Sequence, residues 1–280
     1  MNPPKDNARN YIAIGVAKAK LTTVKMLVLG ALAGMFIALA GVGTTIVQAT
    51  LINTPLVSAG RLLGAVVFPA GLIMVVLAGS ELFTGNCLII IPVLQKEIKL
   101  REMLRNWLFV YIGNFIGSLL ISVITVYSGT YSLFHDAAAA NAIYTAAAKV
   151  NLSFGDALLR GILCNFLVCI AVWMSNAAKD AVGKISALFF PVMLFVLCGY
   201  EHSIANMYFI PTGLLASANP VYVEAYTSVY GSAGLARLTW GSMFTRNIIP
   251  STIGNIIGGA VLVGFMYWFA FLREKRRVKN

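Results

Sequence analysis

Two polar octapeptides interrupt otherwise apolar stretches of the chain, and their side chains include groups that bind anions. They are GSELFTGN at residues 79–86 and GYEHSIAN at residues 199–206, and both fit the pattern Gly-x-Glu-x-x-x-(Gly/Ala)-Asn. Glycine, threonine, serine and asparagine all compete with continued helix. A helix that restarts after such a break directs unpaired N–H groups and the positive end of its dipole toward the break. The two motifs therefore indicate a centre that attracts a negative charge.

His202 is the residue in these motifs with the most versatile chemistry. Its imidazole can donate a hydrogen bond to an anion and can exchange a proton near neutral pH. The only other histidine, His135, lies in an expected loop, and we assign it no special function. Thr84 and Ser203 add hydroxyl groups that could face an anion or could only cap the restarting helices, and these two roles are compatible.

The charged residues near the motifs are harder to place in an anion site. Glu81 and Glu201 would repel an anion if they were ionised and faced its path. We therefore expect both carboxylates to be structural, bound to freed backbone N–H groups or to a neighbouring asparagine or histidine. Lys149 precedes the fourth apolar stretch, where it could concentrate anions at an entrance or could be an ordinary surface lysine.

The elements that would position these residues are membrane-spanning helices. Of the 280 residues, 59% are hydrophobic and 11% are charged, and the apolar residues form runs of about twenty or more, which is typical of a polytopic membrane protein. Six spans are expected, at 25–48, 62–94, 104–127, 156–178, 185–215 and 248–272. The octapeptides fall within the second and fifth spans, so we predict that both are broken at mid-membrane. Irregular backbone at that depth must be buried in protein or line a cavity.

The two halves of the chain resemble each other beyond these breaks. IGNFIG at 112–117 in the third span corresponds to IGNIIG at 253–258 in the sixth. Three spans per half is an odd number, so the second half must insert upside down relative to the first. The predicted fold is an all-α membrane protein with a 3+3 inverted repeat, an architecture typical of conduits. The glycines spaced four apart in these segments predict close helix packing.

The basic residues agree with membrane topology. The net charge is +11, but the sequence has no basic groove with interleaved aromatic residues, so nucleic acid is not an expected partner and membrane lipid is. Sixteen of the 21 lysines and arginines fall at the termini and in two connectors, which predicts that both termini are cytoplasmic. We divide the chain into a cytoplasmic segment at 1–24 that could form an interfacial helix, a channel domain at 25–272 and a basic cytoplasmic tail at 273–280.

No enzyme motif emerges from the chain. The two histidines lie far apart, and there is no metal-ligand cluster, P-loop, GxSxG or GxGxxG pattern. We therefore expect no catalytic residues, no metal and no cofactor.

Three segments together resemble the formate/nitrite transporter family, whose members conduct small monovalent anions such as formate, nitrite and hydrosulfide. They are AGSELFTG at 78–85, GILCNFLVC at 161–169 with AVWMS at 171–175, and GYEHSIANM at 199–207. The resemblance covers residues 25–272 and implies an aquaporin-like protomer of six spans in a homopentamer, in a bacterial inner membrane. It places the family's central histidine at His202, its loop threonine at Thr84, its vestibule lysine at Lys149 and its asparagine at Asn165. The apolar constrictions that it implies match Phe68, Leu72, Leu82, Phe83, Val168 and Phe195.

These expectations combine into a hypothesis about function. An apolar constriction strips water from an anion, and desolvation makes protonation of a weak acid easier. We expect a channel in which Lys149 and the helix ends attract the anion and His202, directly or through water, lends a proton. Formate is the first choice of substrate, followed by nitrite and hydrosulfide. A neutral-solute or water channel and an integral-membrane enzyme are the alternatives.

Overall fold

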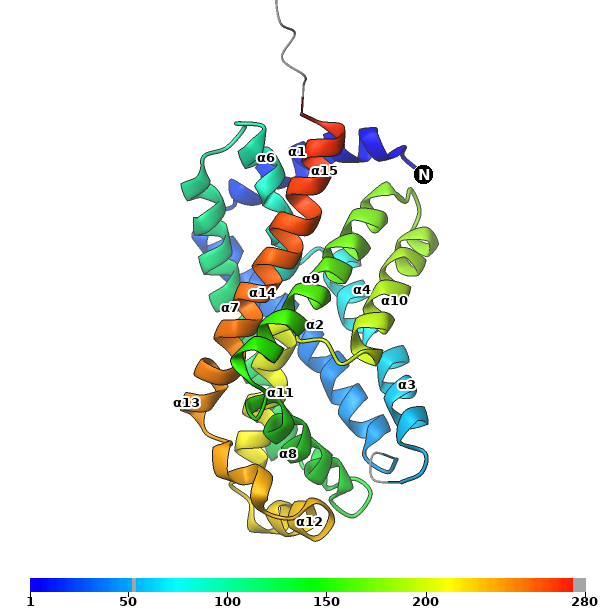
Figure 1. Cartoon of the computed structure of the whole chain (residues 1–280), viewed down its shortest axis with the longest axis vertical. Coiled ribbons are helices and arrows are strands. Elements are labelled where there is room, and N and C mark those ends of the chain that lie inside the picture. The colour runs from blue at the N-terminus through cyan, green and yellow to red at the C-terminus, as the bar shows by residue number, and fades with distance from the viewer. Residues whose placement is uncertain (52–53, 274–280) are drawn as a thin grey trace, which may run out of the picture.

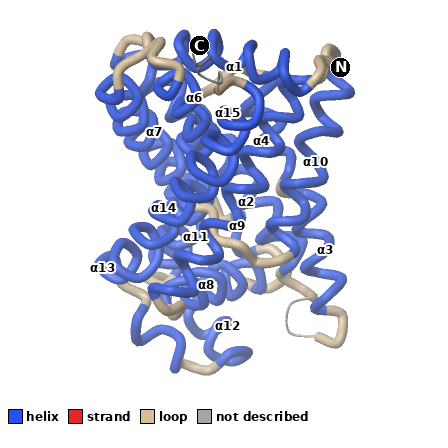
Figure 2. Tube along the Cα trace, turned by 45° about the horizontal axis from the view of Figure 1, so that its top comes forward, coloured by secondary structure: helices blue, strands red, loops and turns tan. Residues whose placement is uncertain are grey.

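Five helical segments of the chain are long and apolar enough to cross a membrane. The computed structural model describes residues 1–51 and 54–273, and within these ranges no strand occurs (Figure 2). The five segments are Thr23–Gln48, Val57–Leu77, Leu100–Tyr127, Phe154–Ala177 and Trp240–Phe271. Another apolar helix, Ala181–Leu197, has 17 residues, fewer than the roughly 20 that a straight crossing needs. The predicted all-helical class with membrane-spanning helices is confirmed.

The first half of the chain runs from α1 to η2. Its elements are α1 (Pro4–Ala19), α2 (Thr23–Gln48), α3 (Val57–Val67), α4 (Pro69–Leu77), α5 (Phe83–Asn86), η1 (Cys87–Ile89), α6 (Ile90–Leu94), α7 (Leu100–Tyr127) and η2 (Thr130–Ser132). Thr22 caps α2, because its side chain accepts a hydrogen bond from the Lys25 N–H. The described residues therefore begin with a short helix before the first long one.

The second half also combines long and short helices. Its elements are α8 (Ala137–Val150), α9 (Phe154–Ala177), α10 (Ala181–Leu197), α11 (Ser203–Ala216), α12 (Pro220–Tyr230), η3 (Ala233–Arg237), α13 (Trp240–Ser242), η4 (Met243–Ile248), α14 (Ile249–Ile256), η5 (Ile257–Phe265) and α15 (Met266–Phe271). Ser153 and Asp180 cap α9 and α10 through their side chains. The helix α8 lies between the third and fourth expected spans, in an alanine-rich part of the chain.

Both octapeptides lie where a helix stops and another starts. Residues 78–82 separate α4 from α5, and residues 198–202 separate α10 from α11. Gly79 has φ +80° and Gly199 has φ +68°, values in the left-handed region that glycine adopts without a steric penalty. The next N–H donates back to the preceding helix in each case, from Ser80 to Val75 O at 2.9 Å and from Tyr200 to Phe195 O at 3.0 Å. Both helices therefore end with a left-handed glycine followed by the long hydrogen bond that is part of a Schellman turn.

Close packing at small residues holds the long helices together. A Cβ added at Gly117 of α7 would collide with the Ala31 backbone of α2, and one added at Gly258 of α14–η5 would collide with the Ile162 backbone of α9. These are the seams that the glycine spacing predicts.

The N-terminal helix packs on one end of the bundle, beside α6 and α15, whereas α8 and α12 lie at the opposite end (Figure 1). In α1 the side chains of Asn7 and Tyr11 are buried, and the Asn7 amide donates to the Trp173 carbonyl oxygen at 2.8 Å. The segment expected as an interfacial helix is therefore helical and contacts protein along one side. The basic tail expected at 273–280 lies outside the described residues, apart from Arg273.

Candidate functional site

Two cavities approach the centre of the bundle from opposite ends. Each has a volume of about 250 Å³. One contains Lys149, Glu201 and His202, and we call it the Lys149 cavity. The other contains Lys18, Glu81 and Asn86, and we call it the Lys18 cavity. Each octapeptide thus contributes its glutamate and its asparagine to one cavity.

A small apolar void of about 10 Å³ separates the two cavities. It shares Leu72 and Leu82 with the Lys18 cavity, and Phe68, Phe195 and His202 with the Lys149 cavity. Its complete lining is Ile37, Phe68, Leu72, Leu82, Val168, Val192, Phe195 and His202. His202 is therefore the single polar side chain in the lining of this void.

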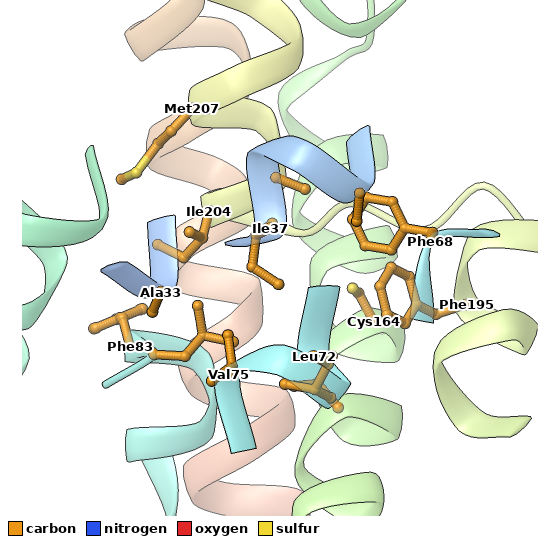
Figure 3. Packing of buried hydrophobic residues seen from close by; sticks show 14 of the residues in the cluster. Ala33, Ile37, Phe68, Leu72, Val75, Phe83, Cys164, Phe195, Ile204 and Met207 are labelled. Atoms are coloured by element: carbon orange, nitrogen blue, oxygen red, sulfur yellow. The ribbon is translucent and has the colours of Figure 1, made fainter. Parts of the chain in front are cut away.

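The structure places five of the six residues expected at the constriction around this void. The exception is Phe83, whose ring packs against Trp107 and Tyr111 with centroid distances of 5.8 and 4.9 Å. Figure 3 shows Phe83 set apart from Phe68, Leu72 and Phe195. Phe83 does not line this void, because the first turn of α5 directs its ring toward α7.

Ile37 and Val192 also line the void and were not anticipated from the sequence. They come from the middles of α2 and α10, where nothing in the local pattern distinguishes them from ordinary core residues. Only the packing of four separate segments brings them to the same space as Leu72 and Val168.

The hydrogen bonds of His202 define which ring nitrogen carries its proton. Nδ1 accepts from the Ala205 N–H at 3.0 Å, and Nε2 lies 2.9 Å from Thr84 Oγ1. Because Nδ1 is an acceptor, the neutral ring carries its proton on Nε2 and donates it to Thr84. The imidazole also stacks on Phe195, with centroids 5.8 Å apart. The two broken segments thus meet through one side-chain hydrogen bond between Thr84 and His202.

The two glutamates form buried ion pairs with lysines. Lys149 Nζ lies 3.0 Å from Glu201 Oε1, and Lys18 Nζ lies 2.7 Å from Glu81 Oε1. Each carboxylate also accepts from the asparagine five residues later, Glu81 from Asn86 at 2.7 Å and Glu201 from Asn206 at 2.6 Å. The structural role with a neighbouring asparagine agrees with the sequence expectation, whereas the lysine partners were not anticipated.

The pairing changes what Lys149 can do for an anion. Its positive charge is matched at close range by Glu201, so the deep part of the Lys149 cavity is close to neutral. Lys149 also lies over the ring of Phe209, 5.4 Å from its centroid. The attracting role expected for Lys149 stays a prediction, and the structure adds that its charge is paired with the Glu201 carboxylate.

The first N–H of each restarting helix is already occupied. Asn114 Oδ1 accepts from the Phe83 N–H at 3.0 Å, and Asn255 Oδ1 accepts from the Ser203 N–H at 2.9 Å. These two groups are therefore unavailable to an anion, and the expectation that the helix ends attract one stays a prediction that rests on the next N–H groups, at Thr84, Gly85 and Ile204. Both asparagines belong to the Ile-Gly-Asn segments that occur in each half of the chain, and their Oδ1 atoms are the acceptors of these two N–H groups.

The same asparagines hold the octapeptides through their amide groups. Asn114 Nδ2 donates to the Glu81 carbonyl oxygen at 2.9 Å, and Asn255 Nδ2 donates to the Glu201 carbonyl oxygen at 2.9 Å. Asn165 is also structural, because its Nδ2 donates to the Thr84 carbonyl oxygen at 3.2 Å and it lines none of the three cavities. The broken segments are thus fixed by side chains from α7, α9 and α14.

Similarity to known proteins agrees with this geometry. The family model described as Formate/nitrite transporter matches residues 5–269. The chain belongs to the formate/nitrite transporter family. It is 40% identical over 264 residues to the formate channel FocA of Escherichia coli (strain K12), covering 93% of this chain and 91% of FocA. It is 35% identical over 287 residues to a probable formate transporter of Methanothermobacter thermautotrophicus, covering 97% of both chains.

Solved structures of the family share the fold. A pentameric formate channel with formate bound superposes with a TM-score of 0.78 at 34% identity, covering 90% of this chain and 98% of that one. A formate/nitrite transporter family ion channel superposes with a TM-score of 0.81 at 26% identity, covering 95% and 98%. These family members are channels and transporters, so this integral membrane protein is a transport protein and not an enzyme.

Proposed function

We propose that this protein is a channel for small monovalent anions of weak acids, with formate as the first substrate and nitrite or hydrosulfide as others. The observation that carries the proposal is the apolar void of about 10 Å³ between two larger cavities that contain charged side chains, with His202 as the one polar residue of its lining. A hydrated anion does not fit this space, and an apolar lining does not replace its water. A neutral small acid meets no such barrier.

We infer that six membrane crossings form a 3+3 inverted repeat, with the second and fifth broken at mid-membrane. Matched hydrogen bonds support this. Asn106 donates to the Lys18 carbonyl oxygen at 3.0 Å, and Asn247 donates to the Lys149 carbonyl oxygen at 3.1 Å. The Schellman turns, the ion pairs and the Asn114 and Asn255 contacts are repeated in the same way. The short helices α1 and α8 then belong to the repeat, at opposite ends of it.

His202 assists protonation of the permeating anion in this mechanism. The neutral ring has one proton, on Nε2, and donates it to Thr84 Oγ1, which is fully buried and lines none of the three cavities. A net proton transfer from the neutral ring would create an imidazolate, so the ring must first take a second proton at Nδ1. Protonation at Nδ1 requires that the hydrogen bond from the Ala205 N–H to Nδ1 breaks. The transfer of a proton to the anion is therefore coupled to a movement of the His202 ring. Thr84 and His202 therefore act as one unit.

The assembly that we propose is a homopentamer with one path through each protomer, in a bacterial inner membrane. A structurally similar family member is described as pentameric with formate bound, which supports both the assembly and the anion. The channel domain spans residues 25–272, and both termini lie on the cytoplasmic side, as the distribution of lysine and arginine indicates.

The test is uptake by proteoliposomes that contain the purified protein. Stopped-flow measurement of formate, nitrite and hydrosulfide side by side is expected to show protein-dependent flux for one or more of them. Chloride, the conjugate base of a strong acid, is the matched control and is expected to pass poorly. Equal flux of chloride and formate would exclude the protonation step. Flux that ignores substrate ionisation would indicate a neutral-solute channel instead.

A further inference from the structure

Each cavity contains a second cation besides its lysine–glutamate pair. Arg61, in the first half of α3, lines the Lys149 cavity, and Lys184, in the first turn of α10, lines the Lys18 cavity. Across residues 1–51 and 54–273, neither side chain has a carboxylate within 4.0 Å. Arg61 is exposed, whereas Lys184, like Lys18, is half-buried.

The charge balance of the two cavities is the same. In the Lys149 cavity the charges of Lys149 and Glu201 cancel, and Arg61 remains. In the Lys18 cavity the charges of Lys18 and Glu81 cancel, and Lys184 remains. No other ionised side chain lines either cavity within the described part of the chain. The attraction that each cavity exerts on an anion therefore comes from its second cation.

The two cations occupy nearly equivalent places in the repeat. Arg61 lies 20 residues before Glu81, and Lys184 lies 17 residues before Glu201. The difference is about one helical turn, so both project from the same region of corresponding half-helices. The two mouths thus share one arrangement, although the residue types differ.

Specific contacts hold Arg61 in place. Its Nε donates to the carbonyl oxygen of Leu197, in the last turn of α10, at 2.8 Å. Its guanidinium also occupies the space that a Cβ at residue 199 would fill, so the glycine there makes room for it. Within the described residues its Nη groups have no protein partner. Arg61 therefore uses its Nε–H to cap the end of α10, and the Nη groups of its guanidinium are left to donate to an anion.

We propose that Arg61 and Lys184 recruit the permeating anion at the two mouths, while the deep ion pairs contribute little net charge. This inference rests on the proposed function. It predicts that the channel's permeability depends on ionic strength, because exposed charges are screened over about 10 Å at 0.1 M salt and about 30 Å at 0.01 M.

Substitutions can separate the charge from the hydrogen bond. Arg61→Gln keeps an N–H donor for Leu197 and loses the charge, whereas Arg61→Lys keeps the charge. Lys184→Gln is a cleaner change of charge, since the Lys184 side chain makes no hydrogen bond among the described residues. Arg237→Gln and Lys179→Gln remove exposed cations that line neither cavity and serve as matched controls.

The readout is the initial rate of formate uptake at pH 7 and at substrate concentrations far below saturation. At about 10 mM ionic strength, Arg61→Gln and Lys184→Gln are each expected to lower permeability by about threefold, and the double variant by more. At about 500 mM ionic strength these differences are expected to disappear. Arg61→Lys and the two control variants are expected to match the wild type at both ionic strengths.

Two different failures can be told apart. If the wild-type protein transports formate and the double variant shows the same permeability and the same salt dependence, the recruiting role is overturned while the channel function stands. If the wild-type protein transports none of the three anions, the proposed function fails and this inference fails with it. Should Arg61→Gln not assemble, Lys184→Gln decides the matter alone.

Discussion

A single hydrogen bond between residues of the two broken segments lies at the centre of the proposed path. Thr84 comes from α5, and His202 precedes α11, 118 residues later. The Ala205 N–H fixes the ring so that Nε2–H faces the threonine. His202 is the one polar side chain that lines the void, and Thr84 accepts its hydrogen bond from outside that lining. Changes at these two residues should therefore act on proton-linked transport and not on the passage of neutral molecules.

Replacing His202 by phenylalanine tests that role. A ring of similar size fills the space but cannot donate or accept a proton, so formate uptake at pH 7 is expected to fall by about tenfold or more, and its pH dependence to flatten. Stopped-flow uptake between pH 5 and 8 is the measurement. Thr84→Ser, which keeps the hydroxyl, is the matched control beside Thr84→Val. A His202→Phe variant with the wild-type pH profile would refute the protonation step.

The buried ion pairs predict an effect on stability. Glu201→Gln leaves the ammonium of Lys149 without its carboxylate, and breaking a buried pair costs about 3 kcal/mol or more. Because the Lys149 side chain keeps 16% of its exposure, we expect the lower end of that range. Thermal unfolding in detergent should show a clear loss, and Glu81→Gln should show a comparable one. Lys149→Met with Glu201→Gln removes both charges and should recover part of it.

At the scale of elements, the breaks depend on how one helix stops and how the next is held. Glycine in the left-handed region allows the Schellman turns that end α4 and α10. The following N–H groups are then taken by Asn114 and Asn255, so the polar backbone at the break is satisfied inside the protein. The irregular segments are therefore rigid parts of the structure.

The two turn glycines should respond differently to alanine. At Gly79 no atom lies within 4 Å of an added Cβ, so Gly79→Ala should cost only the backbone strain, about 1 kcal/mol. At Gly199 the added Cβ would also meet the guanidinium of Arg61, so Gly199→Ala should be more destabilising and should reduce formate uptake at low salt. Thermal unfolding of both variants gives the comparison, and equal losses would contradict the contact with Arg61.

At the scale of the whole molecule, two cavities of equal size meet a short apolar barrier from opposite ends. The ion pairs and the asparagine contacts are matched on the two sides of the barrier, whereas His202 lines only the Lys149 cavity and the void. A passive channel of this kind has one permeability in both directions, so net flux should follow the gradient of the substrate and its proton.

Assembly provides the prediction that belongs to this scale. The described chain exposes large apolar side chains on α3, including Leu62, Leu63 and Val66, which lipid or neighbouring protomers would cover. We expect native mass spectrometry of the detergent-solubilised protein to show five copies. A monomer that remains active after reconstitution would contradict the pentamer. The proposed topology is tested by labelling a cysteine introduced at each terminus, and it would be contradicted if the two cysteines reacted on opposite sides of the membrane.

Much of the fold could be predicted from the sequence because its signals are local. Runs of apolar residues predict membrane helices, and glycine in each octapeptide predicts an interruption, because the required φ is positive. The odd count of spans per half follows from the same runs. Five of the six constriction residues followed from the family resemblance, and their role in transport stays a prediction.

Other features depend on residues that meet only when the chain folds. Glu81 is paired with Lys18 across 63 residues, and no local pattern links them. The occupation of the Phe83 and Ser203 N–H groups by asparagines, and the direction of the Phe83 ring toward α7, likewise depend on how α7 and α14 pack. By itself the sequence determined the all-helical, apolar class of the fold and the two octapeptides at which one helix stops and another starts. Only the tertiary structure decided that Lys18 and Lys149 are paired with glutamates in the two cavities, while Arg61 and Lys184 have no carboxylate partner among the described residues. The reason is that electrostatic balance depends on distances between residues that are far apart in the sequence.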